Sequence, residues 1–474
     1  MQSADRTGWL RPALAFVAAL TALRLLALAF DRTDIFVDEA QYWLWGQRLD
    51  FGYYSKPPLI GWVIRLVTDL AGSDAPFWLR MPGALLHGIT ALILGALAAR
   101  IAGAKAALWT AVLYVSLPFV AVGSVMISTD TVMAPFYAGA ALFFWRAGET
   151  RAPRDALIAG VCTGAAFMAK YVAFYMFMGA GLAMLFVPAR RIGWRNTVLM
   201  GLAFAVVIAP NVVWNLTHQL ATVEHTMDNV GWVRTGAALN WASMAEFVLS
   251  QFGVFGPVTM AALLWAIVRG RGGDVRALAL LSLPPLIVVT VQALLGKAYA
   301  NWAVAAYFTG VIAAVLMLPP WGRWAALVVN MVAALLVPLL IVAAPWPELH
   351  GKPALNRYLG RAELSRRILA LAQAEDVPVY ASDRDILADL FYIGRDAGVT
   401  VYAPRAEGRP RNYYEQNFPL PEGFDGRILV IRRGPMDCGQ GDVPPAGILN
   451  ASGVWAGKNI TPYIVTGDCL AAAD

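Results

Sequence analysis

Residues 324–344, WAALVVNMVAALLVPLLIVAA, are 21 consecutive residues without a charged side chain. A run of about 20 apolar residues is long enough to cross the hydrocarbon core of a bilayer as one helix. Comparable runs recur along the chain, of whose 474 residues 59% are hydrophobic and only 14% are charged. This composition predicts an α-helical polytopic membrane protein.

Ten further apolar runs precede this one, at residues 12–30, 77–99, 106–123, 131–146, 155–169, 171–188, 197–215, 243–268, 277–296 and 300–318. Together they predict about eleven transmembrane helices. The first run exceeds an ordinary signal-peptide core and lacks a following cleavage pattern, so we expect it to be a retained membrane helix. Residues 57–71 are short and contain Arg65 and Asp69, which favours an interfacial or re-entrant helix.

Basic residues gather in alternate connections between these runs: Arg6 and Arg11; Arg100 and Lys105; Arg146, Arg151 and Arg154; Arg190, Arg191 and Arg195; Arg269, Arg271 and Arg276; and Arg323. The positive-inside rule assigns that side to the cytoplasm. Topology therefore explains the formal net charge of +6, and no nucleic-acid partner is expected. The remaining connections, which contain the unusual polar residues, then face outward.

The composition changes after Pro345, where charged residues, proline and glycine become frequent. We therefore divide the chain into a transmembrane domain, residues 1–345, and a soluble extracytoplasmic domain, residues 346–474. In the second domain, helical patterns at 364–374 and 383–396 alternate with strand patterns at 377–381, 399–403 and 427–433. This alternation predicts a small α/β layer. In an oxidising compartment Cys438 and Cys469 could form a disulfide or stay free.

The first outward connection contains the stretch FVDEAQYWLWGQRLDFGYYSKPPL, residues 36–59. Its acids, Asp38 and Glu39, have a purely structural explanation as N-terminal residues of a helix. The aromatic residues that follow could anchor a helix at the membrane interface or stack on a sugar. The paired acids, the aromatic residues and Lys56 before two prolines together favour a functional site.

These motifs have a recognisable order along the chain: VDEAQYW at 37–43, GYYSKPPLIGW at 52–62, STD at 128–130, AKY at 169–171, and WN at 214–215 with a downstream histidine. In this order they resemble the bacterial PMT-type glycosyltransferases of the GT-C superfamily. Relatives there include protein O-mannosyltransferases and the aminoarabinose transferases that modify lipid A. The resemblance implies transfer of a sugar, with inversion, from a polyprenyl-phosphate donor to an envelope glycolipid, glycan or protein. It also implies a bacterial inner-membrane location, with the C-terminal domain in the periplasm.

A single displacement needs a carboxylate base and cations beside the leaving phosphate. On this basis and on the resemblance, we assign Asp38, Glu39 and Asp130 to catalysis; Lys56, Lys170, Lys297, Arg80 and Tyr54 to the donor phosphate or lipid; and Tyr42, His225 and Tyr299 to the acceptor or sugar. Asp38 is the expected base and Lys56 the leading phosphate ligand.

Structural alternatives apply to several of these residues. Lys170, Lys297 and Arg80 could snorkel from helix ends. Asp130 could share helix capping with its neighbours Ser128 and Thr129. His225 could be an ordinary surface residue.

The sequence departs from the aminoarabinose enzymes at two positions, where Gln41 and Ser55 replace their arginine and glutamate. The departure weakens the case for an amino-sugar donor, so a neutral hexose or pentose is expected. No metal-ligand spacing is present, and no cofactor is assigned. A divalent metal is the alternative, although we expect activity to persist in chelator. The competing function is a transporter or flippase of a lipid-linked sugar.

Overall fold

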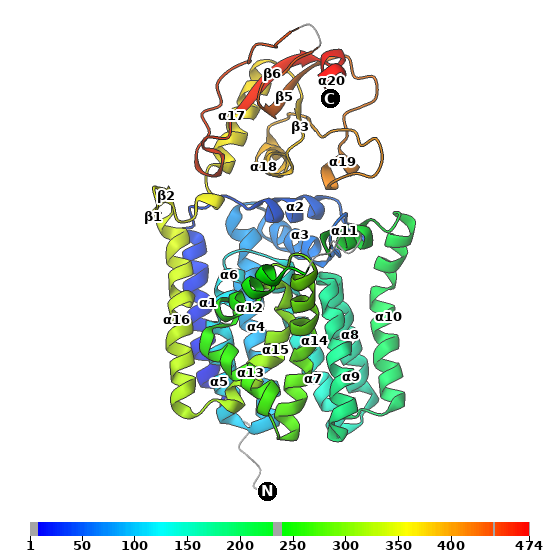
Figure 1. Cartoon of the computed structure of the whole chain (residues 1–474), viewed down its shortest axis with the longest axis vertical. Coiled ribbons are helices and arrows are strands. Elements are labelled where there is room, and N and C mark those ends of the chain that lie inside the picture. The colour runs from blue at the N-terminus through cyan, green and yellow to red at the C-terminus, as the bar shows by residue number, and fades with distance from the viewer. Residues whose placement is uncertain (1–7, 231–238, 439–440, 474) are drawn as a thin grey trace.

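A computed structural model describes residues 8–230, 239–438 and 441–473 of the chain (Figure 1). Most helices run side by side in one bundle, and a smaller mixed domain sits on one end of it. The bundle contains α1 (Leu10–Ala29), α4 (Pro76–Ala102), α5 (Ala104–Ser116), α6 (Pro118–Gly123), α7 (Thr129–Thr150), α8 (Pro153–Ala169), α9 (Tyr175–Phe186), α10 (Trp194–Thr217), α12 (Trp241–Phe255), α13 (Pro257–Arg269), α14 (Gly273–Leu295), α15 (Ala305–Met317) and α16 (Pro320–Ala343). The fold confirms the predicted polytopic helical class.

The apolar runs of the sequence all fall on helices, but several of these helices are short. By length and composition, five described helices, α1, α4, α10, α14 and α16, can cross a membrane, or six if α12 and α13 are counted as one broken span. The predicted run 243–268 is not one straight helix, because α12 and α13 meet at 113°. The bend lies at Gly256, whose φ of +83° suits glycine, and Pro257 then begins α13.

Two short helices, α2 (Val37–Gln47) and α3 (Leu59–Ala71), lie across the end of the bundle beneath the smaller domain (Figure 1). They pack closely where two glycines meet, since a Cβ atom on Gly46 would lie 2.9 Å from the carbonyl oxygen of Gly61. The crosswise position of α3 agrees with the interfacial helix expected for residues 57–71. A third short helix, α11 (Ala221–Val230), lies at the same end.

The basic connections meet at the opposite end of the bundle. Arg100 on α4 pairs with Glu149 at the end of α7 at 2.5 Å. Arg190, in the short 3-10 helix η2 (Pro188–Arg190), pairs with Asp274 at the start of α14 at 3.3 Å. The tertiary structure thus brings basic connections together at the end away from the C-terminal domain.

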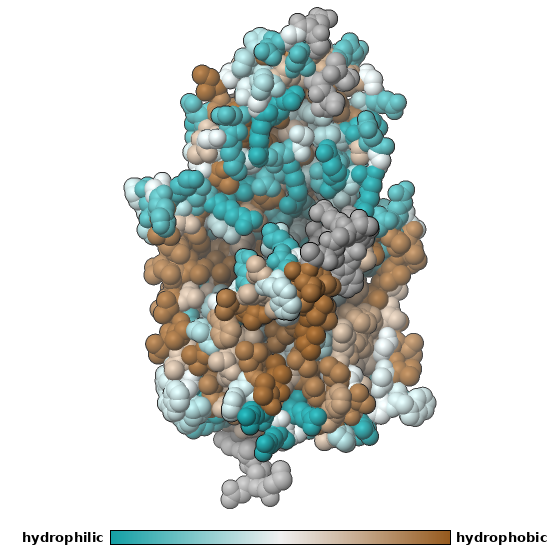
Figure 2. Space-filling model, in the orientation of Figure 1, coloured by the Kyte–Doolittle hydropathy of each residue, from teal (hydrophilic) through white to brown (hydrophobic). Residues whose placement is uncertain are grey.

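The outer surface of the bundle is apolar. Figure 2 shows a broad hydrophobic band over the helices and a hydrophilic surface over the C-terminal domain. Large side chains such as Val206 on α10, Val268 on α13 and Leu339 on α16 are 64–74% exposed. Contiguous exposed apolar surface of this kind indicates contact with lipid. The chain is a multi-pass membrane protein.

The C-terminal domain is built on a four-stranded sheet with the order β4 (Val401–Tyr402), β3 (Val379–Ala381), β5 (Arg427–Arg433) and β6 (Ile460–Thr466). Strand β3 is parallel to β4 and β5, whereas β5 and β6 are antiparallel. The domain also contains α17 (Arg361–Ala374), α18 (Arg384–Ile393), α19 (Tyr413–Asn417), α20 (Gly467–Ala473) and the hairpin of β1 (Glu348–Leu349) and β2 (Lys352–Pro353).

The small α/β layer predicted from the sequence is present, but strand β6 was not predicted. β6 lies at the edge of the sheet and contains Pro462, which weakens its strand signal. Alternate residues of the neighbouring strand β5 face opposite sides of the sheet: Ile428 and Val430 pack with Tyr463, while Leu429 and Ile431 belong to the larger core. The sheet is therefore covered on both faces.

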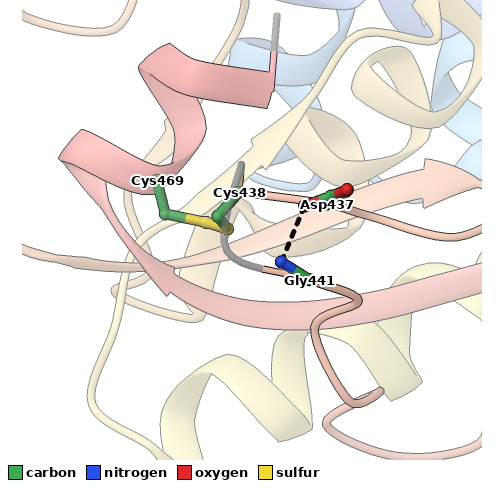
Figure 3. The surroundings of a disulfide bond; sticks show 4 residues. All are labelled: Asp437, Cys438, Gly441 and Cys469. Atoms are coloured by element: carbon green, nitrogen blue, oxygen red, sulfur yellow. Dashed lines mark hydrogen bonds between the residues drawn. A yellow bond between two sulfur atoms is a disulfide. The ribbon is translucent and has the colours of Figure 1, made fainter.

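Cys438 and Cys469 form a disulfide that ties α20 to the loop after β5 (Figure 3). Beside it, the amide of Gly441 donates a hydrogen bond of 3.2 Å to the Asp437 carboxylate. The sequence had left open whether these cysteines pair.

Candidate active site

The site begins at helix α2, whose first turn carries Asp38 and Glu39. Glu39 itself caps the helix, because its carboxylate accepts a hydrogen bond of 3.0 Å from the amide of Phe36. Acidic residues in the first turn also interact favourably with the helix dipole. The two carboxylates then diverge, since consecutive helical residues point about 100° apart.

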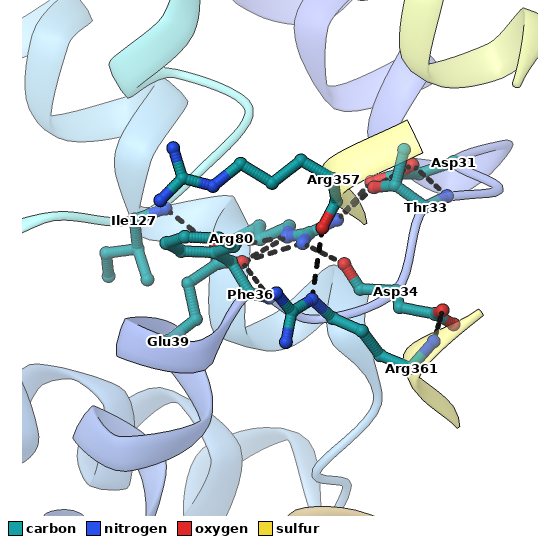
Figure 4. Close-up of polar contacts among 9 residues, drawn as sticks. All are labelled: Asp31, Thr33, Asp34, Phe36, Glu39, Arg80, Ile127, Arg357 and Arg361. Atoms are coloured by element: carbon teal, nitrogen blue, oxygen red, sulfur yellow. Dashed lines mark hydrogen bonds and ion pairs between the residues drawn. The ribbon is translucent and has the colours of Figure 1, made fainter. Parts of the chain in front are cut away.

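Glu39 points into the protein (Figure 4) and is only 1% exposed. Its carboxylate binds Arg80 of α4 at 2.7 Å and accepts a hydrogen bond of 3.1 Å from the amide of Ile127. Arg80, also buried, contacts Asp31 at 2.5 Å and the carbonyl oxygen of Asp34 at 2.8 Å. The network joins the first outward connection to α4 and to the start of α7.

This position changes the interpretation of two predicted site residues. Glu39 was assigned to catalysis and Arg80 to the donor phosphate, but each uses its hydrogen-bonding groups on the other and on nearby backbone. Removing Arg80 would leave the buried Glu39 carboxylate without its cation, and removing Glu39 would leave Arg80 with Asp31 as its remaining carboxylate, so both changes are unfavourable. The geometry therefore favours a structural role for both residues rather than the direct contacts assigned to them.

Asp38 points the other way, toward the C-terminal domain. Its carboxylate accepts a hydrogen bond of 2.6 Å from Nη2 of Arg384, the first residue of α18. Both side chains are partly open to solvent, 49% for Asp38 and 40% for Arg384. Arg384 also donates from Nε and Nη2 to the amide oxygen of Gln41, at 3.0 and 2.8 Å.

Asp130 lies at the start of α7 and forms a second polar group. Ser128 is the cap of α7, since its hydroxyl accepts a hydrogen bond of 3.3 Å from the amide of Thr131. The Asp130 carboxylate instead receives Nζ of Lys170, which lies 2.8 Å from both oxygens, and Nδ2 of Asn301 at 3.1 Å. Lys170 is thus paired rather than snorkelling.

Lys170 reaches Asp130 because the helix breaks there. It is the C-cap of α8, with an extended backbone, and the 3-10 helix η1 (Tyr171–Phe174) follows before α9. Asn301 likewise lies in a short 3-10 helix, η3 (Ala300–Ala303), before α15. Breaks between helices therefore supply both partners of Asp130.

Lys56 connects the two polar groups electrostatically. Burial, together with the positive charge of Lys170, lowers the pKa of Lys56 to about 8, whereas Asp38 and Asp130 oppose this change. Within the described part of the chain, the Lys56 ammonium group has no hydrogen-bond acceptor. We define the charge cluster as Asp38, Lys56, Asp130, Lys170 and Arg384.

The predicted aromatic and histidine residues lie around this cluster in different ways. Tyr42 is buried beside it, and burial followed by the charge of Asp38 raises its pKa. Tyr54 packs against His225 of α11 with ring centroids 5.0 Å apart, and its hydroxyl donates to the carbonyl oxygen of Pro410 at 2.9 Å. Tyr54 thus touches the C-terminal domain as well as α11.

Lys297 and Tyr299 form a separate pair. The Lys297 ammonium lies 5.0 Å from the centre of the Tyr299 ring, and the Tyr299 side chain is 55% exposed. Among the described residues, neither side chain forms a hydrogen bond or ion pair with a residue of the charge cluster, although both precede Asn301 closely in the chain. The structure brings their segment, rather than their side chains, to Asp130.

The C-terminal domain closes over α2 through aromatic and backbone contacts. The Tyr392 ring of α18 packs edge-on against Trp43 at 5.2 Å, and its hydroxyl donates to the carbonyl oxygen of Asp74 at 2.6 Å. Near the buried network, the amide of Arg361 donates to the Asp34 carboxylate at 2.8 Å (Figure 4). Arg384 is therefore held above Asp38 by a docked domain.

Arg384 was missed by reasoning from the sequence, and so was the contact of Gln41 with it. Arg384 lies 346 residues from Asp38, within an ordinary amphipathic helix, so no local pattern distinguishes it. Asn301 could have been assigned to the site from the sequence, because it is a polar residue in an outward connection. Among the described residues, no group of three or more His, Cys, Asp or Glu side chains is arranged to hold a metal ion.

Comparison with known proteins agrees with this architecture. The family described as dolichyl-phosphate-mannose-protein mannosyltransferase matches residues 55–214. The lipid A galacturonosyltransferase RgtD of Rhizobium johnstonii is 42% identical over 473 residues, which cover 97% of this chain and 99% of that protein.

Solved structures share the fold. ArnT from Cupriavidus metallidurans bound to undecaprenyl phosphate has a TM-score of 0.66 at 14% identity, with 99% of both chains covered. An Archaeoglobus fulgidus oligosaccharyltransferase has a TM-score of 0.51 at 12% identity and covers 82% of this chain and 63% of its own.

The chain belongs to the bacterial PMT-type glycosyltransferases of the GT-C superfamily. It is a membrane glycosyltransferase. The family and the enzyme class predicted from the sequence motifs are confirmed.

Proposed function

We propose that the chain transfers a galacturonate residue from a polyprenyl phosphate to lipid A. The observation that carries this proposal is the 42% identity, over nearly the full length of both chains, to a lipid A galacturonosyltransferase. The proposed donor sugar is therefore acidic, and not the neutral hexose or pentose expected from Gln41 and Ser55. Three cations in the charge cluster, Lys56, Lys170 and Arg384, support an anionic donor.

In the proposed reaction, Asp38 removes the proton of an acceptor hydroxyl. The hydroxyl oxygen forms a bond to the anomeric carbon while the bond from that carbon to the phosphate oxygen breaks, which inverts the anomeric configuration. The partial exposure of Asp38 leaves its carboxylate accessible to an acceptor. A positioned carboxylate base contributes about 10²- to 10⁴-fold to such a rate.

Lys56 is the proposed ligand of the leaving phosphate. Its ammonium lies in a partly buried position without an acceptor among the described residues, so an incoming phosphate oxygen can supply one. Asp130 and Asn301 hold Lys170, which adds a second positive charge. Cations in a poorly hydrated site stabilise the charge that develops on a leaving phosphate.

The other predicted ligands keep more limited proposed roles. Tyr42 and His225 contribute to the wall that faces the sugar or acceptor, and Tyr54 contributes beside the donor lipid. Lys297 and Tyr299 form a peripheral contact for the donor or acceptor. No metal is required by this scheme, and we expect full activity in the presence of a chelator.

We propose that the charge cluster faces the periplasm from the inner membrane. The collection of basic connections at the opposite end of the bundle supports this orientation, as does the disulfide in the C-terminal domain. An alkaline phosphatase fused after residue 474 is expected to be active. An active cytoplasmic reporter at that position would reverse the orientation.

We also propose that residues 1–345 form the transmembrane unit and that residues 346–474 complete its site by supplying Arg384. If this is correct, removal of residues 346–474 abolishes transfer even when the remaining bundle stays in the membrane. Unchanged transfer rate and acceptor choice after this deletion would contradict the role of the second unit.

The central test uses the purified protein, a polyprenyl-phosphate galacturonate and lipid A that lacks the sugar. Mass spectrometry is expected to show lipid A enlarged by one galacturonate residue, with release of polyprenyl phosphate. Movement of the intact donor across proteoliposome membranes without bond cleavage would instead identify a flippase. Transfer to another acceptor, but not to lipid A, would overturn the proposed acceptor.

A further inference from the structure

Arg384 offers two unused hydrogen-bond donors to the site. A guanidinium group has five N–H bonds. The contacts to Gln41 and Asp38 occupy Nε and Nη2. Within the described residues, Nη1 of Arg384 has no acceptor, and the side chain is 40% exposed. One nitrogen of the fork is therefore available to a ligand.

Neutral residues hold this guanidinium in place. The amide oxygen of Gln41 accepts two hydrogen bonds from Arg384, while its Nε2 faces the Ser55 hydroxyl at 3.5 Å. Because Gln41 and Ser55 carry no charge, they orient Arg384 without neutralising it. Among the described residues, Asp38 is its one anionic partner.

Among the described residues, two cations of the charge cluster, Lys56 and Arg384, keep donor groups without a hydrogen-bond acceptor. The cluster has three cations, Lys56, Lys170 and Arg384, against two acids, Asp38 and Asp130. Asp130 is occupied by Lys170, and the donor phosphodiester carries one negative charge for Lys56. Arg384 belongs to the C-terminal domain and is separate from Lys56 and the phosphate. Its planar guanidinium group can donate hydrogen bonds to a second anionic group on the sugar.

We propose that Arg384, oriented by Gln41 and Ser55, binds the carboxylate of a uronate sugar and so selects the donor. This inference rests on the proposed galacturonate transfer and adds the residue that reads the acidic group. In this arrangement Nη1 donates to a carboxylate oxygen, while the bond to Asp38 holds the base beside the same sugar. Arg384 is then a specificity residue rather than a base or a phosphate ligand.

A simpler role for Arg384 would be to position Asp38 alone. The two roles differ in their response to the donor, because a positioning residue affects a neutral and an acidic sugar equally. The matched donors are polyprenyl-phosphate galacturonate and polyprenyl-phosphate galactose, which differ only at C6. The measurement is kcat/KM for transfer to lipid A with each donor, for the wild-type enzyme and for Arg384→Met.

We expect the wild-type enzyme to prefer galacturonate and Arg384→Met to lose about 10- to 100-fold more kcat/KM with galacturonate than with galactose. Gln41→Glu supplies a second variant that keeps the side-chain size and neutralises Arg384 in place. It is expected to lower galacturonate use selectively as well. Arg427→Met is the control, because Arg427 pairs with Glu375 in the same domain and has no place in the charge cluster.

The outcomes separate the two proposals. If the wild-type enzyme transfers galacturonate and Arg384→Met loses the same factor with both donors, Arg384 only positions Asp38 and the inference fails while galacturonate transfer stands. If the wild-type enzyme transfers galactose but not galacturonate, the proposed function itself fails. Thermal unfolding in detergent verifies that Arg384→Met and Gln41→Glu are folded. If Arg384→Met does not fold, the donor preference of Gln41→Glu provides the test instead.

Discussion

Asp38 and Glu39 are adjacent acids in one helical turn, yet they belong to two different environments. Glu39 is 1% exposed and bound to Arg80, whereas the Asp38 side chain is 49% exposed and bound to Arg384 of another domain. Both are carboxylates paired with arginine. The difference in burial decides what each can do, because the Asp38 carboxylate is open to a substrate while it stays paired, whereas a substrate contact at Glu39 would break a buried pair.

The largest expected effect is on catalysis at Asp38. Asp38→Asn keeps the size of the side chain but cannot accept a proton, so we expect kcat to fall about 10²- to 10⁴-fold. Thermal stability should stay close to that of the wild-type enzyme. The control is Asp69→Asn, because Asp69 forms an exposed pair with Arg65 on α3. Retention of more than a tenth of kcat in Asp38→Asn would exclude Asp38 as the base.

A loss of stability rather than of chemistry is expected at Glu39. Glu39→Gln leaves Arg80 with Asp31 as its remaining carboxylate partner, and breaking a buried pair costs about 3–5 kcal/mol. The midpoint of thermal unfolding in detergent measures this effect. Glu149→Gln removes an exposed pair with Arg100 and should cost less than about 1 kcal/mol. Equal effects of the two changes would show that burial is not the decisive difference.

A smaller effect is expected at the second polar group. Asn301→Ala removes the 3.1 Å hydrogen bond to Asp130, and a hydrogen bond to a charged group contributes about 1.5–3 kcal/mol. We therefore expect kcat/KM to fall about 10- to 100-fold through misplacement of Asp130 and Lys170. Asn196→Ala is the matched change at the opposite end, where the amide binds the carbonyl oxygen of Arg151. An unchanged kcat/KM in Asn301→Ala would show that the position of Asp130 does not affect the reaction.

The smallest expected effect concerns the pH dependence set by Lys56. With its pKa lowered to about 8, Lys56 is mostly charged at pH 7 and loses its proton as the pH rises through that value. Phosphate binding needs the charged form, so kcat/KM should decline above about pH 8, roughly tenfold by pH 9. Lys56→Arg, which stays charged, should remove this decline at the expense of a few-fold lower activity at pH 7. The same decline in both proteins would assign it to another group.

The sequence predicted most of the fold because hydrophobicity acts locally. Runs of apolar residues located the helices of the bundle, and the change of composition after Pro345 marked the start of a different kind of domain. The bend at Gly256 and the edge strand around Pro462 were not predicted. The bend follows from Gly256 and Pro257, which interrupt one continuous apolar run, and the edge strand is held by its pairing with β5.

The candidate site could be predicted only in part. Short motifs identified Asp38, Lys56, Asp130 and Lys170. The structure joins Asp130 to Lys170 and places Lys56 within electrostatic range of the other three. The first motif also selected Glu39, and Arg80 was chosen as a further cation, but both lie in the buried network. A sequence motif records residue types, but it does not record which way a side chain points.

By itself, the amino-acid sequence determined that this chain enters a membrane and which connections between its apolar runs are basic. These properties follow from the transfer of individual residues between water and lipid, so they need no knowledge of distant contacts. Only the tertiary structure decided that Arg384 meets Asp38 across 346 residues and that Glu39 pairs with Arg80 inside the protein. Those pairings arise from helix rotation and from the docking of one domain on another, which bring together charges that the chain itself keeps far apart.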